Sequence, residues 1–213
     1  DLVRIGASMT KAKPFISLPG WSPGGLIDAQ NLRARFAPPD HRDLARRDMA
    51  LPLPCGATMT APTLVATMLV MLGPVAGARI LEIGTGSGYC SALLARLGAR
   101  VTTMERYRTL HREASERAKA LGFENITFLH EDGARGHAEG GPYDRIIVHA
   151  AMSGVPKPLF EQLASHGVLL CALGPGGSMQ RLVRHEKAGS RLEEAVVGTV
   201  WWQPLKAGKA AAL

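Results

Sequence analysis

Between residues 79 and 173, short apolar runs alternate with longer stretches in which apolar residues recur every three or four positions. The runs typical of buried strands cover residues 79–83, 100–104, 126–130, 145–148 and 168–173, and the helix-length stretches cover residues 89–97, 108–121 and 156–164. Short apolar strands that alternate with helices indicate a parallel sheet with helices on both faces. The pattern therefore predicts an α/β fold with a doubly wound, mostly parallel sheet.

The flanking residues predict a C-terminal hairpin and a less regular N-terminal segment. Residues 180–186 and 195–202 are typical of an antiparallel strand pair, which completes a seven-stranded sheet with an antiparallel C-terminal hairpin. Residues 63–72 predict a helix that ends at Gly73-Pro74. Proline and glycine interrupt residues 1–30 too often for a long element, and residues 28–48 predict a helical stretch broken at Pro38-Pro39. The tail, residues 206–213, is rich in alanine and lysine, and we expect it to be frayed.

Length and composition restrict the class of protein. The 213 residues suit one globular unit, and no apolar run approaches the roughly 18–20 residues of a membrane span. Transmembrane and intrinsically disordered classes are therefore excluded. Three scattered cysteines without C-x-x-C spacing argue against a disulfide framework and a structural zinc site. With no signal-peptide pattern, they favour a reducing compartment, so we expect a cytoplasmic protein without a bound metal.

The formal net charge of +7 leaves three explanations open: a nucleic-acid partner, an anionic substrate, or an arginine-rich composition. The basic residues are dispersed among acids and carry no interleaved aromatic residues. The stacking surface of a single-strand binder is therefore missing. We expect neither a nucleic-acid nor a membrane partner, and a monomer or weak homo-oligomer.

The sequence Leu-Glu-Ile-Gly-Thr-Gly-Ser-Gly-Tyr, residues 81–89, lies where the first strand of the predicted sheet turns into a helix. Glycines at such a turn let the backbone approach a ligand, and the helix start offers free N–H groups. A dinucleotide fingerprint needs glycine at the position of Tyr89, and a P-loop needs a lysine that is missing. The remaining pattern, E-x-G-x-G-x-G, resembles the one with which class I methyltransferases bind S-adenosylmethionine.

Two acidic residues support this interpretation. Glu105 ends the second strand, where a carboxylate can accept hydrogen bonds from both ribose hydroxyls, and Asp132 follows the third strand, where it can meet the adenine end. Both lie at carboxyl ends of predicted strands, which is where open α/β sheets bind ligands. The alternative is that the glycine loop is only a tight turn and the acids are solvated strand ends.

These motifs, with others in the same order, resemble the protein-L-isoaspartate O-methyltransferases over about residues 35–205. The further matches are Arg35-Phe36-Ala37-Pro38, Thr58-Met59-Thr60-Ala61-Pro62, Asp132-Gly133-x-x-Gly136, Pro142-Tyr143-Asp144 and Pro204-Leu205. The resemblance implies a Rossmann-like methyltransferase domain at residues 63–213, beneath an N-terminal cover and substrate-side segment at residues 1–62. It also implies a cytosolic protein-repair enzyme, which uses S-adenosylmethionine without a metal to methylate the free carboxylate of L-isoaspartyl residues in damaged proteins or peptides.

The resemblance also implies the site residues. The cofactor-binding positions are Ala57, Thr58, Met59, Thr60, Glu82, Gly84, Thr85, Gly86, Ser87, Gly88, Glu105, Arg106, Asp132 and Gly133. Thr60 stands where the family has a loop serine, and its hydroxyl is expected to orient the substrate carboxylate. A second role as the N-cap of the following helix can coexist with this one. A carboxylate with a pKa of about 4 is ionised at neutral pH, so it needs no general base.

Departures from the family pattern fall on the substrate side. They include Arg46, His149, Trp201, Trp202 and Gln203, all expected near the substrate. His149 is either a general base for a hydroxyl or amine acceptor or a packed strand-end histidine. Two alternatives therefore stay open: a relative retargeted to another peptide carboxylate, a small molecule or RNA, and a non-catalytic module that binds S-adenosylmethionine.

Overall fold

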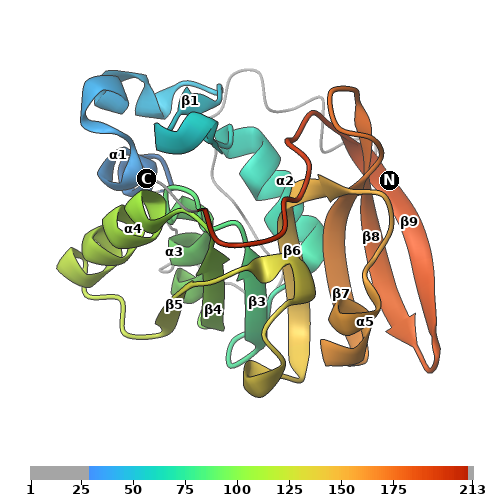
Figure 1. The fold of residues 1–213 in the computed structure, drawn as a ribbon. Coiled ribbons are helices and arrows are strands. Elements are labelled where there is room, and N and C mark those ends of the chain that lie inside the picture. The colour runs from blue at the N-terminus through green and yellow to red at the C-terminus, as the bar shows by residue number, and fades with distance from the viewer. Residues whose placement is uncertain (1–28, 211–213) are drawn as a thin grey trace.

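The computed structural model describes residues 29–210, and its centre is one seven-stranded sheet in the order β5-β4-β3-β6-β7-β8-β9. The strands are β3 (Arg79–Ile83), β4 (Arg100–Glu105), β5 (Ile126–His130), β6 (Tyr143–Met152), β7 (Leu163–Leu173), β8 (Gln180–Ala188) and β9 (Arg191–Val200). β3 to β7 pair in parallel, whereas β8 and β9 are antiparallel (Figure 1). The predicted doubly wound sheet with an antiparallel C-terminal hairpin is confirmed.

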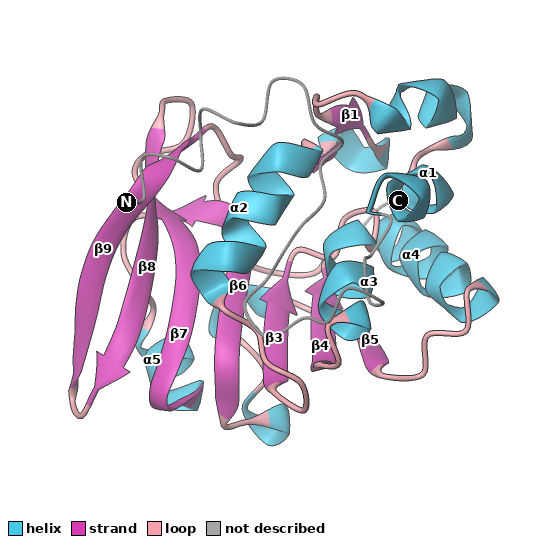
Figure 2. Cartoon of the chain, turned by 180° about the vertical axis from the view of Figure 1, so that it is seen from behind, coloured by secondary structure: helices cyan, strands magenta, loops and turns pink. Residues whose placement is uncertain are grey.

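Helices cover both faces of this sheet. They are α1 (Ala29–Phe36), α2 (Pro62–Leu72), α3 (Tyr89–Arg96), α4 (Arg108–Ala120) and α5 (Lys157–Gln162). In Figure 2, α2 and α3 lie in front of the strands and α5 lies behind them. Apolar residues of α1 to α4 share one core cluster, whereas α5 contributes Leu159 to the other cluster. None of these helices, within the described residues, is long and apolar enough to cross a membrane.

A compact N-terminal cover lies over one end of the sheet. It consists of α1, the 3-10 helices η3 (Pro39–Arg46) and η4 (Pro54–Gly56), and the short paired strands β1 (Leu51–Pro52) and β2 (Thr58–Met59). Its core residues Phe36 and Met59 pack in the same apolar cluster as Leu69 of α2 and Leu93 of α3. The cover therefore shares a core with the rest of the chain. The division at residue 62 stays a prediction, and the expectations for residues 1–28 lie outside the described residues.

Three predicted element boundaries are wrong because distant strand pairing overrides the local pattern. The helix expected at 156–164 ends at Gln162, since Leu163 already pairs with Tyr143 in the sheet. β6 extends well beyond the predicted 145–148, with register shifts along its pairing to β7. β9 ends at Val200, so Trp201 and Trp202 lie beyond the strand expected at 195–202.

The tail is not frayed over its described part, residues 206–210. The Gly208 N–H donates to Asp132 Oδ2 at 2.8 Å, and the Gly208 carbonyl accepts from Arg106 Nε at 3.0 Å. The Ala210 N–H donates to the Arg106 carbonyl, and Lys209 forms an ion pair with Glu131 at 2.8 Å. The expectation fails here because the tail finds partners at the carboxyl ends of β4 and β5, which its composition could not reveal.

Candidate active site

A cavity of about 370 Å³ lies at the carboxyl ends of the parallel strands. It is centred where the strand order reverses between β3 and β6, which is where open α/β sheets bind ligands. Its walls come from the loop after β3, the ends of β4 and β6, the loop after β5, the segment around β2 and the chain that follows β9. Six separated parts of the sequence therefore meet at one site.

The glycine loop closes tightly over the end of β3. The Gly84 and Thr85 N–H groups donate to the Met104 carbonyl, so the loop is fastened to β4. Gly84 has φ +92°, and a Cβ there would lie 3.2 Å from the His149 Cβ. Only glycine combines this conformation with such close approach to β6. The loop therefore presents backbone, rather than side chains, to the cavity.

Glu105 at the end of β4 is the buried carboxylate of the cavity wall. Only 5% of the residue is exposed. Its Oε2 accepts from the Gly86 N–H at 3.0 Å, and its Oε1 accepts from the Tyr107 N–H at 3.0 Å. An ionised carboxylate has about four lone-pair sites, so two remain for a ligand. Glu105 thus fastens the glycine loop and still presents acceptors to the cavity.

Thr60 lies in the loop between β2 and α2 and lines the cavity. The alternative role as N-cap is wrong, because α2 begins at Pro62 and its N-cap is Ala61. The free N–H of Thr63 is satisfied instead by Asp48 Oδ1 at 3.0 Å. Among the described residues, no protein group is hydrogen-bonded to the Thr60 hydroxyl, which leaves that hydroxyl available to a ligand.

Arg33 of α1 holds the Thr60 loop from behind. Its side chain is fully buried, and burial lowers the pKa of its guanidinium. The guanidinium donates to the carbonyls of Ala45 at 2.8 Å, Met49 at 2.7 Å and Thr60 at 3.2 Å. One side chain therefore joins the N-terminal cover to the loop that carries the candidate catalytic hydroxyl.

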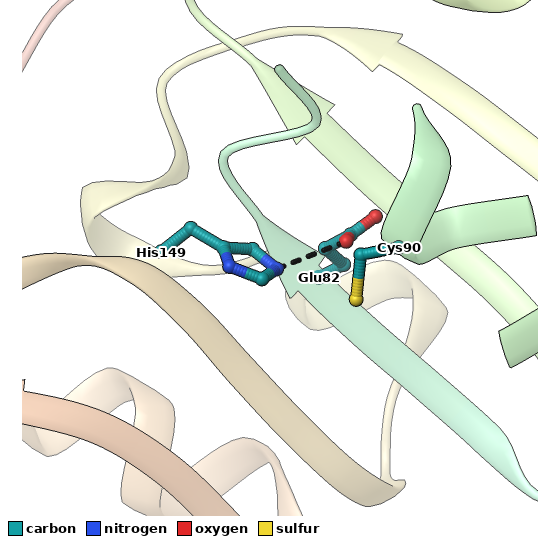
Figure 3. Close-up of side chains that lie close together, drawn as sticks. All are labelled: Glu82, Cys90 and His149. Atoms are coloured by element: carbon teal, nitrogen blue, oxygen red, sulfur yellow. Dashed lines mark hydrogen bonds and ion pairs between the residues drawn. The ribbon is translucent and has the colours of Figure 1, made fainter. Parts of the chain in front are cut away.

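His149 in the carboxyl-terminal half of β6 is hydrogen-bonded to Glu82 of β3, with Nε2 and Oε1 3.0 Å apart (Figure 3). The Glu82 carboxylate is fully buried and also accepts from the Ser91 hydroxyl. The thiol of Cys90 is the third group at this point (Figure 3), and burial and the Glu82 carboxylate raise its pKa well above the ordinary value. His149 itself lines the cavity, where its ring lies 5.9 Å from that of Trp202.

The segment after β9 closes the cavity opposite the glycine loop. Ala151 of β6 donates to the Gln203 carbonyl at 2.9 Å, and Leu205 donates back to the Ala151 carbonyl at 2.8 Å. The Gln203 amide donates to the Gly56 carbonyl at 2.7 Å. The chain therefore leaves β8 after Val200 and joins the end of β6, which carries Trp202 into the cavity wall.

Known proteins of one family match this chain over most of its length. The family model of the protein-L-isoaspartate(D-aspartate) O-methyltransferases matches residues 29–210. A protein-L-isoaspartate O-methyltransferase from Azorhizobium caulinodans is 44% identical over 181 residues, which cover 85% of this chain and 83% of the relative. One from Caulobacter vibrioides is 40% identical over 195 residues, which cover 87% of each chain. The chain belongs to this family.

Solved structures support the same fold for this protein-L-isoaspartate O-methyltransferase family member. A structure named protein-L-isoaspartate O-methyltransferase matches with a TM-score of 0.75 and 26% identity, covering 83% of this chain and 59% of that chain. A Plasmodium falciparum chain of the same name, in complex with S-adenosyl-L-homocysteine, matches with a TM-score of 0.70 and 23% identity, covering 84% of this chain and 90% of that one. The resemblance inferred from the motifs is confirmed.

The structure brings most of the expected family site residues together. Those that line the large cavity are Ala57, Thr58, Thr60, Gly84, Gly86, Glu105, Arg106, Gly133, His149, Trp202 and Gln203. Met59, Thr85 and Ser87 line a smaller cavity beside it. Glu82, Gly88, Asp132 and Arg46 line neither, and the Arg46 guanidinium donates to Asn31 Oδ1 at 3.0 Å on the surface. The individual roles of all these residues stay predictions.

Sequence reasoning missed three contributors to the site. Arg33 reaches the Thr60 loop through carbonyl groups, and Lys206 lines the cavity from the tail. Cys90 joins Glu82 and His149 from a different element. The role of Arg33 could not be predicted from the sequence, because its acceptors are backbone carbonyl groups, which every residue has. For Cys90, the signal in the sequence is its position directly after the glycine motif.

Proposed function

We propose that this chain transfers the methyl group of S-adenosylmethionine to the free carboxylate of L-isoaspartyl residues in damaged proteins and peptides. One observation carries the proposal: the glycine loop, the Glu105 carboxylate and the unpaired Thr60 hydroxyl converge on one cavity, in a chain of this family. The named relatives share about 40–44% of their residues with it over most of their length.

The donor side fits S-adenosylmethionine. Gly84 and Gly86 present backbone to the cavity, and the two remaining acceptor sites of Glu105 suit the two ribose hydroxyls. Both Asp132 oxygens already accept backbone N–H groups, from Ala134 and Gly208. We therefore place the adenine end against the backbone at Gly133, which lines the cavity, rather than on the Asp132 carboxylate.

The acceptor side fits a carboxylate. Bound S-adenosylmethionine supplies a methyl group on a positively charged sulfur, and an ionised carboxylate oxygen forms the new bond as the carbon–sulfur bond breaks. Because negative and positive charge cancel in this step, a cavity that excludes water favours it. The chain must hold the carboxylate in line, for which the Thr60 hydroxyl is available, and Trp202 and Gln203 line the same cavity.

The experiment is a methylation assay with paired peptides. The protein is incubated with labelled S-adenosylmethionine and a peptide that contains one L-isoaspartyl residue, with the matched L-aspartyl peptide as control. We expect a base-labile label on the isoaspartyl peptide only, and a strong loss of that label with Thr60→Ala but not with Thr60→Ser. Equal labelling of both peptides, or none on either, would refute the proposal.

The His149–Glu82 pair favours a second candidate function. An imidazole whose Nε2 is held by a buried carboxylate resembles a general base with its orienting acid. Such a pair suits an acceptor that must lose a proton, such as a hydroxyl or an amine. The stability of the methylated product discriminates the two functions, because esters hydrolyse in mild base whereas ethers and methylamines do not.

The proposed function also implies where the protein acts and what it binds. We place the reaction in the cytoplasm, because all three cysteines are free thiols and so favour a reducing compartment. The partner is a flexible peptide with one carboxylate, for which a nucleic-acid surface is not needed. A monomer or weak homo-oligomer stays our expectation.

A further inference from the structure

Methyl transfer to a carboxylate does not require the cluster of three side chains that lies beside the cavity. Glu82 on β3, Cys90 in the first turn of α3 and His149 on β6 place a carboxylate oxygen, a sulfur and an imidazole nitrogen within 4.8 Å of one another (Figure 3). Two of the three residues are buried, and the His149 side chain is 13% exposed. The three elements bring these groups together from separate parts of the chain.

The carboxylate at the centre of this cluster has no strong cationic partner. Glu82 is fully buried, and within the described part of the chain its side chain contacts His149 Nε2 and forms no ion pair with a lysine or an arginine. A buried carboxylate is costly unless hydrogen bonds and a positive charge compensate it. The Ser91 hydroxyl supplies a hydrogen bond. A proton on Glu82, a proton on His149 or a bound cation can each remove the cost of this buried charge, and only the cation also uses the Cys90 sulfur.

The three donor atoms suit one class of cation. A thiolate, an imidazole and a carboxylate together form a ligand set for Zn²⁺ and similar divalent transition ions, and not for Mg²⁺ or Ca²⁺. In a tetrahedral zinc site, nitrogen and oxygen ligands lie about 3.3 Å apart, and a sulfur lies about 3.5 Å from either. The observed separation of His149 Nε2 and Glu82 Oε1 is 3.0 Å. The Cys90 sulfur lies within 4.8 Å of both of these atoms.

A fourth ligand position is also available. A cavity of about 40 Å³ is lined by Cys90, His149 and Thr60, between the glycine loop and the Thr60 loop. A volume of about 15 Å³ is enough for one water molecule. Three protein ligands with a water in the fourth position is the arrangement of an open zinc site, in contrast to the closed four-ligand sites that are purely structural.

We propose that Glu82, Cys90 and His149 bind a divalent transition ion of the zinc class, with water as the fourth ligand. The ion replaces the proton on the Cys90 sulfur and any proton on His149 Nε2, and these protons leave to solvent. A carboxylate and a thiolate then balance the two positive charges, so the buried complex is neutral. The inference contradicts our sequence-based expectation of no metal, and it does not depend on which acceptor the enzyme methylates.

The test is a titration of the full chain with Co²⁺, which occupies zinc sites and gives a thiolate-to-cobalt absorption band in the near ultraviolet. We expect a saturable band in the wild type that Zn²⁺ displaces. Cys90→Ser should abolish the band and weaken Zn²⁺ binding at least about 100-fold, since it removes a direct ligand. The matched control is Cys55→Ser, which removes the half-buried thiol outside the cluster and should leave the band unchanged.

The outcomes distinguish a specific site at these three residues from nonspecific metal binding elsewhere on the chain. A band that survives Cys90→Ser, or that disappears with Cys55→Ser, would overturn the proposal, as would a wild type without a saturable band. If Cys90→Ser does not fold, His149→Asn decides the matter in the same titration, because that side chain is partly exposed. His149→Asn should lower Zn²⁺ affinity at least about tenfold, while the thiolate-to-cobalt absorption band is still observed because Cys90 remains a ligand.

Discussion

Replacing Glu105 separates two roles that the structure assigns to one carboxylate. The side chain fastens the glycine loop through the Gly86 and Tyr107 N–H groups, and its remaining acceptor sites face the cavity. Glu105→Ala removes both roles. Glu105→Gln keeps the shape and one acceptor oxygen, but it removes the charge and replaces the other oxygen with an NH2 group, which cannot accept a backbone N–H. Unfolding measurements therefore report on the fastening role, and donor affinity reports on the ligand-binding role.

The expected size follows from the strength of hydrogen bonds to charged groups. Two ribose bonds to an ionised carboxylate contribute about 1.5–3 kcal/mol each, so Glu105→Ala should weaken donor binding roughly 10²- to 10⁴-fold. Glu105→Gln turns charged bonds into neutral ones and should cost about tenfold to 100-fold. The alanine variant should also lower the free energy of unfolding by about 1–3 kcal/mol for each buried N–H group left unsatisfied.

The measurement is calorimetric titration with S-adenosylhomocysteine, together with urea unfolding of each variant. Glu113→Ala is the matched control, because Glu113 is an acid on α4 that pairs with Arg117 across one helical turn and does not line the cavity. Such a pair contributes only about 0.5 kcal/mol, and donor affinity should not change. If Glu105→Ala loses stability yet binds the donor as tightly as the wild type, the ribose assignment is refuted.

Three further predictions test other parts of the structure. Thr60→Ala should lower kcat about tenfold to 100-fold, with donor affinity unchanged, whereas Thr60→Ser should retain activity; equal loss in both variants would contradict the hydroxyl role. Gly88→Ala should lower the midpoint of thermal unfolding by more than Gly122→Ala does, because a Cβ at Gly88 lies 3.0 Å from the Ala114 Cβ whereas the space at Gly122 is open, and both glycines have positive φ. Burial lowers the pKa of His185, so unfolding takes up a proton below about pH 6.5 and stability falls as the pH falls. His185→Leu should flatten that slope, by up to about 1.4 kcal/mol per pH unit in urea-unfolding experiments, and an unchanged slope would show that folding does not lower the pKa of His185.

The fold could be predicted where local pattern and tertiary pairing agree. The strands at residues 79–83 and 126–130 have the predicted bounds, because each is an apolar run. The prediction fails at Leu163, which a helical pattern includes but which pairs with Tyr143 in the sheet. Local periodicity carries no information about a partner twenty residues away in sequence, and that partner decides the structure there.

The site could be predicted in part for a geometric reason. Gly84 follows β3, Glu105 is the last residue of β4, and His149 lies in the carboxyl-terminal half of β6. The carboxyl ends of parallel strands share one edge of the sheet. Arg46 has no such constraint, and it lies at the end of a 3-10 helix with its guanidinium on Asn31. The tail residues were also not predicted, since their partners are Arg106 just after β4 and the acids Glu131 and Asp132 just after β5.

The sheet alone does not form the whole cavity, because segments near both ends of the described chain position parts of its walls. On the acceptor side, Arg33 donates to the Thr60 carbonyl and so fixes the loop that presents the hydroxyl. On the donor side, Gly208 is hydrogen-bonded to Asp132 and to Arg106, which follows Glu105 in the cavity wall. Parallel strands can position groups only at their own ends, so a reaction that must align two molecules and exclude water needs walls from elsewhere. The N-terminal cover and the C-terminal tail supply these walls, which is why residues with no recognisable motif belong to the active site.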